Sequence, residues 1–206
     1  HNAVNPVLLA NRLASPEPNA RAAAVRVALY WRDRLPDPLA IIRAAAQDPH
    51  PRVRLEAVRA ASYFSSWEAA DAALLALAKP TDYYLTYVIT ETIRQLEPFW
   101  RKAIADGLPL CASNPAGVNF LMASVSTAEL LKLPRTPLVF NALLSRPDVA
   151  ESNRIEALDG LAKTSQSSVA AEAFRALANL KNASDNALTD LARIAARQPQ
   201  QDLRAL

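Results

Sequence analysis

The sequence predicts an all-α protein, an α-solenoid of about six to seven antiparallel helix pairs. Three observations predict this fold class. A segment recurs after 33 residues, apolar residues recur with the period of a helix, and glycine is almost absent. Because only three glycines occur in 206 residues, glycine-rich phosphate loops and the tight turns of β-hairpins have almost nowhere to form.

The repeat is clearest between residues 15–29 and residues 48–62. An offset of 33 places identical residues at seven of these fifteen positions, namely Pro16/Pro49, Pro18/Pro51, Arg21/Arg54, Ala24/Ala57, Val25/Val58, Arg26/Arg59 and Ala28/Ala61. A third copy begins at Asp148, where an offset of 100 repeats the spacing of Asp48 and Arg54. Between these copies, Pro80 opens a degenerate unit that lacks the arginine. The period is typical of stacked helical hairpins.

Helices are expected wherever apolar residues recur at i, i+4, i+7 and i+8. Their expected ranges are 4–14, 18–32, 37–47, 51–64, 67–78, 82–97, 98–106, 116–123, 126–132, 137–146, 149–163, 167–180 and 184–197. Prolines gather just before several of them, because proline is tolerated in a first helical turn and excluded from a helix interior. Ser66 and Ser126 are expected N-caps, and no segment indicates a strand.

The chain is expected to divide into two helical arrays. Residues 1–106 form N-terminal repeats, and residues 118–206 form C-terminal repeats packed as a continuation of the first array. Between them, residues 107–117 interrupt the helical pattern with two glycines and two prolines. This segment is expected to be an irregular connection or hinge.

The pattern of aspartate, five residues, arginine, two residues, alanine and then a branched apolar residue resembles the signature of HEAT repeats. The resemblance implies an armadillo-type superhelix and a structural ladder of aspartates and arginines between neighbouring repeats. Its expected members are Asp48, Arg54, Asp148 and Arg154, with Arg21 opposite a substituted Ser15. The period of 33 is shorter than the usual HEAT length of about 40–47 and matches ankyrin in length alone, since the ankyrin motif is absent.

A second resemblance rests on five stretches that begin at Tyr30, Asp48, Asp82, Leu96 and Leu130. They read Tyr-Trp-Arg-Asp, Asp-Pro-His-Pro-Arg-Val-Arg-Leu-Glu-Ala-Val-Arg-Ala, Asp-Tyr-Tyr-Leu, Leu-Glu-Pro-Phe-Trp and Leu-Leu-Lys-Leu-Pro-Arg. Together they resemble the HEAT segment of large exported bacterial proteins, in which a glucose/sorbosone dehydrogenase-like propeller and a cytochrome c-type haem domain flank the repeats. The resemblance implies an exported or periplasmic setting between two redox modules.

Catalytic, cofactor-binding and metal-ligating residues are not expected in this chain. Histidine chemistry needs converging ligands, but only His1 and His50 occur, and His50 is interpreted as a turn residue between two prolines. The single Cys111 excludes an intrachain disulfide and any CxxC or CxxCH motif, and a buried structural thiol is expected. The chain is therefore predicted not to be an enzyme, with any catalysis lying in domains outside it.

Two sets of residues are candidates for a contact surface. Tyr84 and Tyr87 share one helix face with Glu91 and Arg94, although ordinary packing against the next repeat explains them equally simply. Two further candidates are arginines at equivalent repeat positions, Arg26 and Arg59.

The arginines of the first sixty residues raise the possibility of nucleic-acid binding. Residues 1–60 carry nine arginines against five acidic residues, whereas the other 146 residues carry a net charge of −1. Several arginines recur at fixed repeat positions, as structural groups would. The favoured interpretation is a protein-binding scaffold or interdomain spacer without a cofactor or a membrane span, and the alternative is a basic nucleic-acid-binding module.

Overall fold

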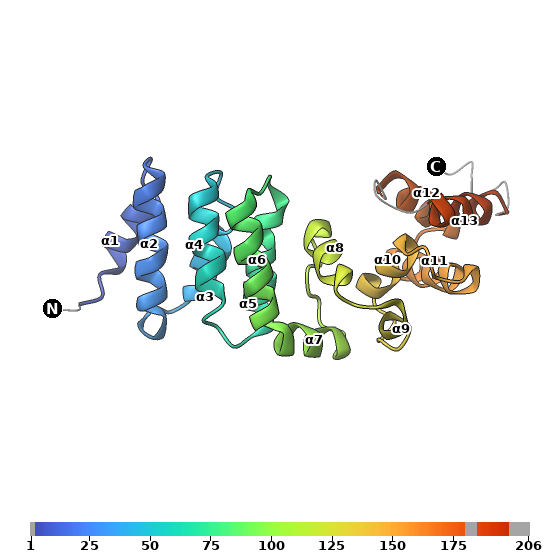
Figure 1. The fold of residues 1–206 in the computed structure, drawn as a ribbon, viewed down its shortest axis with the longest axis horizontal. Coiled ribbons are helices and arrows are strands. Elements are labelled where there is room, and N and C mark those ends of the chain that lie inside the picture. The colour runs from blue at the N-terminus through green and yellow to red at the C-terminus, as the bar shows by residue number, and fades with distance from the viewer. Residues whose placement is uncertain (1–2, 180–184, 198–206) are drawn as a thin grey trace. The chain divides into compact units, whose positions relative to one another are not determined.

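The computed structural model describes residues 3–179 and 185–197, and these residues form thirteen α-helices, two short 3₁₀ segments and no strand (Figure 1). The predicted all-α fold class is confirmed. The chain divides into two compact units. Unit 1 comprises residues 1–104 and 108–117, and unit 2 comprises residues 105–107 and 118–206.

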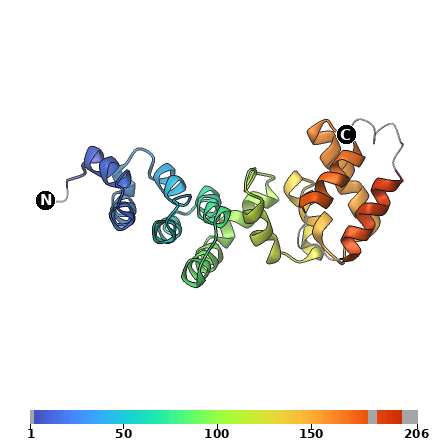
Figure 2. The ribbon, with the colours of Figure 1, turned by 90° about the horizontal axis from the view of Figure 1, so that it is seen from above.

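Unit 1 is a stack of three helix pairs followed by one further helix. Its elements are α1 (Pro6–Leu13), α2 (Pro18–Tyr30), the 3₁₀ segment Arg32–Arg34, α3 (Pro38–Ala45), α4 (Pro51–Ala61), α5 (Trp67–Leu74), the 3₁₀ segment Leu75–Ala78, α6 (Tyr83–Gln95) and α7 (Glu97–Ala105), whose last residue falls in unit 2. Each of the pairs α1/α2, α3/α4 and α5/α6 packs together. The second helices α2, α4 and α6 form one row, and α3 and α5 lie behind it (Figures 1 and 2). This is the stacking of an α-solenoid.

Small residues allow the helices of the row to approach closely. Ala24 on α2 and Ala57 on α4 are buried, as are the valines that follow them, Val25 and Val58. On α6 the larger Leu85 and Ile89 fill the same inner side. Because a helix pair cannot cover its own apolar face, stacking the pairs is what builds a continuous core.

Unit 2 contains two packed helix pairs and two shorter elements. Its elements are α8 (Pro115–Ala123), whose first three residues fall in unit 1, α9 (Thr127–Leu130), α10 (Pro137–Ser145), α11 (Glu151–Ser165), α12 (Val169–Asn179) and α13 (Asp185–Ala196). The pair α10/α11 packs together, as does α12/α13, and α11 also contacts α12. Leu143 and Leu158 are fully buried between α10 and α11 and their neighbours.

The helix starts follow the expected signals. Proline occupies the first turn of α1, α2, α3, α4 and α10. Ser126 forms a capping box with Glu129 at the start of α9, whereas Ser66 stands at the N-cap of α5 without a side-chain hydrogen bond. Two predicted helices were too long, because the ranges 18–32 and 67–78 each end in a 3₁₀ segment. The predicted helix ends at residues 180 and 184 lie outside the described residues.

Residues 108–117, which include most of the expected hinge, are held against α5. The Cys111 amide donates to Asp71 Oδ1 at 2.8 Å, and the Asn114 Nδ2 donates to the Leu74 carbonyl at 2.9 Å. Burial raises the pKa of the Cys111 thiol to about 12, with the neighbouring Asp71 carboxylate adding to the shift. Cys111 is therefore a protonated, buried thiol, and a hinge over residues 107–117 stays a prediction.

Gly160 in the middle of α11 provides a test of core packing in unit 2. Replacing an interior glycine with alanine usually stabilises a helix by about 1 kcal/mol. Here a Cβ would lie 2.2 Å from Cε2 of the buried Phe140 ring. We expect Gly160→Ala to lower the free energy of unfolding by about 1–3 kcal/mol in chemical denaturation.

The matched control is the same substitution in a Phe140→Leu background, where the added methyl group meets no ring. There we expect Gly160→Ala to cost less or to stabilise. A stabilising effect of Gly160→Ala in the wild-type background would contradict the observed packing.

Candidate functional site

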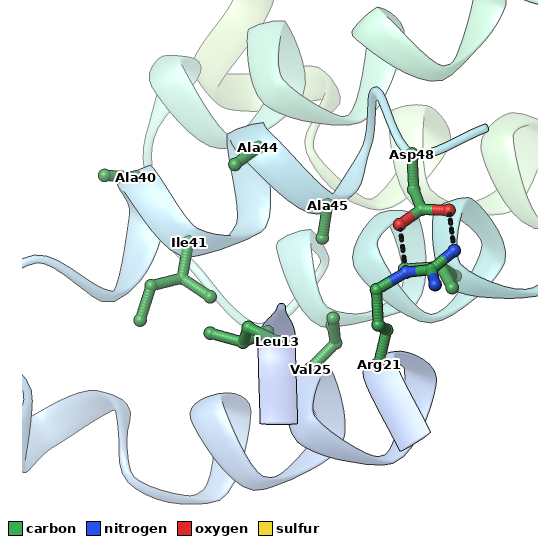
Figure 3. A pocket seen from close by; sticks show the side chains of 9 residues that line it. Leu13, Arg21, Val25, Ala40, Ile41, Ala44, Ala45 and Asp48 are labelled. Atoms are coloured by element: carbon green, nitrogen blue, oxygen red, sulfur yellow. Dashed lines mark hydrogen bonds and ion pairs between the residues drawn. The ribbon is translucent and has the colours of Figure 1, made fainter. Parts of the chain in front are cut away.

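The joint between the first two repeats is closed by one arginine and one aspartate (Figure 3). Arg21 on α2 donates from Nε to Asp48 Oδ2 at 2.7 Å and from Nη2 to Asp48 Oδ1 at 2.8 Å. Its remaining nitrogen, Nη1, donates to the carbonyls of Ser15 and Pro16 at 2.9 and 3.1 Å. The guanidinium thereby joins the turn before its own helix to the turn before the next one.

The ion pair depresses the acidity constant of its carboxyl group. Burial alone would raise the pKa of Asp48, but hydrogen bonds from Arg21 and from the His50 amide hold that pKa below its ordinary value. His50 itself is the N-cap of α4, where its Nδ1 accepts from the Arg52 amide at 3.2 Å. It is thus a turn residue, as the sequence predicts.

The equivalent arginine of the second repeat makes a different cross-joint contact. Arg54 Nη1 donates to the carbonyls of Asp48 and Pro49, both at 3.0 Å, and Nη2 donates to the Pro80 carbonyl at 2.6 Å. The carboxylate of Asp48 is bound to Arg21 and is not brought to Arg54. At the next repeat the position of Asp48 is occupied by Thr81, so Arg54 reaches a backbone carbonyl there.

In unit 2 the predicted ladder residues are likewise placed apart. Asp148 accepts from the Thr127 hydroxyl at 2.8 Å. Arg154 is fully buried and donates to the carbonyls of Leu143 and Arg146 at 3.1 and 2.6 Å. Its acidic partner is Asp190 on α13, at 3.3 Å, which the sequence pattern does not single out. The buried charge is therefore both paired and hydrogen-bonded.

A groove of about 400 Å³ lies beside the Arg21–Asp48 pair. Figure 3 shows it bordered by side chains of α1, α2 and α3, among them Leu13, Val25 and Ile41. Its only charged lining residues are Arg21 and Asp48, which are committed to one another. The groove offers an apolar surface and no group poised for acid–base chemistry.

A second arginine cluster lies on the side of α2 and α4 away from the first helices. Glu56 on α4 is buried, and three arginines surround its carboxylate. Arg59 Nε lies 3.2 Å from Oε2, whereas Arg26 Nε and Arg52 Nε lie 3.3 and 3.8 Å from Oε1. The structure thus brings together Arg26 of one repeat and Arg59 of the next, both predicted contact residues.

The exposed side of α6 continues this surface. Tyr84 and Tyr87 are 70% and 58% exposed, so neither is consumed by packing within unit 1. Glu91 accepts from Arg94 Nη2 at 2.6 Å, and this exposed pair is locally neutral. A further contact sets the register of α6, because Gln95 Nε2 donates to the Ser62 carbonyl at 2.9 Å, just after α4. We call the exposed side chains of Arg26, Arg52, Arg59, Tyr84, Tyr87, Glu91 and Arg94 the outer face of the row.

Two searches for other functional features within the described ranges are negative. Residues 3–179 and 185–197 hold no group of three or more histidine, cysteine, aspartate or glutamate side chains placed to bind a metal ion. Over the same ranges no helix combines the length and the apolar character that crossing a bilayer requires. His1 lies outside the described residues.

Comparison with known families then decides the character of the first array. Residues 5–94 match the family model of HEAT repeats. HEAT repeats are generally scaffolds for protein interactions and are typically non-catalytic. The matched HEAT segment begins just before α1 and ends within α6, so it contains all three stacked pairs of unit 1. No curated protein and no solved structure matches the chain.

The functional groups that sequence reasoning missed are the acidic partners. Glu56 could have been found, because it stands four residues after Arg52 and three before Arg59, a spacing that places all three on one helix face. Asp71 and Asp190 had no such signal. Their partners Arg43 and Arg154 lie 28 and 36 residues away and meet them only through helix stacking.

The Arg21–Asp48 pair predicts an acid-sensitive contribution to stability. Since the pKa of Asp48 is lower in the folded than in the unfolded chain, ionised Asp48 stabilises the fold above the unfolded pKa of about 3.9. That contribution is lost as the pH falls through the folded pKa. We expect Asp48→Asn to cost about 1–3 kcal/mol at pH 7 and progressively less in acid, in denaturant titrations at each pH.

Glu91→Gln is the matched control, because it removes a carboxylate whose arginine partner is exposed. It should change stability little at any pH between neutrality and the acid range. Equal costs for both substitutions, or a cost for Asp48→Asn that does not shrink in acid, would contradict the role of the repeat joint.

Proposed function

We propose that this chain is a non-catalytic scaffold that holds a protein partner, or a neighbouring domain of its own polypeptide, on the outer face of the row. The observation that carries the proposal is the combination of a HEAT-repeat match over residues 5–94 with two tyrosines left exposed beside fully buried neighbours on the same helix. Tyrosine favours protein interfaces because it combines apolar area with a hydrogen-bonding tip.

Exposure of Tyr84 and Tyr87 argues against the simpler packing explanation. Leu85 and Ile89 between them are fully buried, so the inner side of α6 already supplies the contacts with α4 and α5. The tyrosines therefore add little to the stability of unit 1. Their exposed apolar area is available to a partner.

An exported redox setting forms the second part of the proposal. The sequence stretches that resemble the HEAT segment of exported dehydrogenase–cytochrome proteins support it, and a scaffold between two redox domains would serve as an interdomain spacer. Redox chemistry would then belong to the flanking domains. The encoded sequence beyond these 206 residues tests this setting, since flanks without a CxxCH motif or a propeller pattern would contradict it.

The alternative function is nucleic-acid binding by the basic surface of residues 1–60. Its supporting observation is the cluster of Arg26, Arg52 and Arg59. A gel-shift titration with random duplex at low salt tests it directly. A shift that disappears in Arg26→Gln/Arg59→Gln would favour the nucleic-acid module over the protein scaffold.

Site-specific photo-crosslinking in the native cell tests the scaffold itself. A benzophenone amino acid at Tyr87 should crosslink to a protein, or to another domain of the same polypeptide. The same probe at Asn11, an exposed residue of α1, should give no such product. Equal crosslinking from both positions, or products from Tyr87 that contain only nucleic acid, would contradict the proposed face.

A further inference from the structure

The arginine cluster around Glu56 holds more cationic groups than its carboxylate can neutralise. Arg26, Arg52 and Arg59 supply three positive charges against one negative charge, so the cluster carries a net charge of +2. The Glu56 side chain is 6% exposed, whereas the three arginine side chains are 43%, 54% and 37% exposed. The buried carboxylate anchors the cluster, and its positive groups face solvent.

Hydrogen-bond accounting shows how much donor capacity remains. Each guanidinium carries five N–H donors, yet within the described residues only Arg59 donates a side-chain hydrogen bond, from Nε to Glu56 at 3.2 Å. In each of the three arginines the atom nearest to Glu56 is Nε. The paired Nη1 and Nη2 groups are the edges that bind carboxylates bidentately, and they make no hydrogen bond to the described residues.

The repeat itself generates this arrangement. Arg26 and Arg59 occupy equivalent positions in successive repeats, 33 residues apart, so stacking α2 on α4 places them beside one another. The position equivalent to Glu56 in the first repeat is Ala23, so the two arginines share a single carboxylate. The mismatch between two repeat arginines and one glutamate produces the charge excess, to which Arg52 adds.

We propose that the Arg26–Arg52–Arg59 cluster is the docking site for a carboxylate-rich segment of the protein partner. This inference rests on the scaffold function proposed above and names the chemistry of the segment that the scaffold holds. Aspartate and glutamate side chains match both the charge of the cluster and the bidentate geometry of its outward guanidinium edges. Tyr84 and Tyr87 on α6 extend the same face with apolar area for the uncharged part of the segment.

The charge distribution favours an acidic protein segment over a nucleic acid. A nucleic-acid surface gains affinity from a long track of phosphate contacts, typically about 6–10 of them. On the outer face the charge excess is confined to the cluster around Glu56, because Glu91 neutralises Arg94 on α6. A charge of +2 suits a short run of carboxylates.

The test measures binding of a fluorescent peptide to the full chain. A fluorescein-labelled peptide of alternating glutamate and glycine is titrated at low and at physiological ionic strength, with a glutamine–glycine peptide and a single-stranded oligonucleotide as competing probes. We expect the acidic peptide to bind more tightly than both, and Arg26→Gln/Arg59→Gln to weaken its binding about tenfold or more.

The matched control removes the same number of positive charges elsewhere. Arg12 and Lys132 are exposed and lie outside the outer face, so Arg12→Gln/Lys132→Gln should change the affinity by about twofold or less at physiological salt. Circular dichroism checks the folding of each variant. If Arg26→Gln/Arg59→Gln does not fold, Arg52→Gln serves instead, because Arg52 is the most exposed member of the cluster, and it should weaken binding severalfold.

Three results would overturn the inference. Equal losses in the cluster and control variants would make the binding a general charge effect, tighter oligonucleotide binding through the same arginines would favour a nucleic acid, and no binding of the acidic peptide would remove the proposed ligand class. The last result, combined with protein crosslinks from Tyr87, would leave the scaffold function standing. Failure of the crosslinks would instead count against the scaffold.

Discussion

The repeats depend on an arginine buried at each joint that binds the backbone of the turn preceding its own helix. Arg21 donates to the carbonyls of Ser15 and Pro16, and Arg54 donates to the carbonyls 33 residues further on, those of Asp48 and Pro49. A helix that starts with proline leaves the preceding turn with carbonyls that need donors. A guanidinium has enough donors to satisfy this turn and still reach the next repeat.

This joint explains how a stack of small residues presents a defined surface. The inner sides of α2 and α4 are rich in alanine and valine, which bring the helices close but specify little about their register. Directional contacts supply the register, through Arg21 to Asp48 at one joint and Arg54 to Pro80 at the next. A fixed register is what allows Arg26 and Arg59, from different repeats, to meet at Glu56 on the outer face.

The sequence predicted the helices well and the partners of the charged residues poorly, for a physical reason. Helix starts are local features, set by prolines and capping side chains, so α2 begins at the expected Pro18 and α9 at a capping box. An arginine reaches any acceptor within a long side chain's length. The sequence pattern therefore identified Arg54 and Arg154 as repeat positions, but it did not distinguish a carboxylate from a carbonyl as their acceptor.

Native-state hydrogen exchange of Arg54→Gln tests the role of the joint most directly. Arg54 lies on α4 but contacts the Pro80 carbonyl ahead of α6, so its loss should speed exchange in both helices. The account predicts faster amide exchange in α4 and α6 together, with α11 in unit 2 unchanged. Faster exchange confined to the first turn of α4, or no change at all, would contradict the claim that buried arginines couple the repeats.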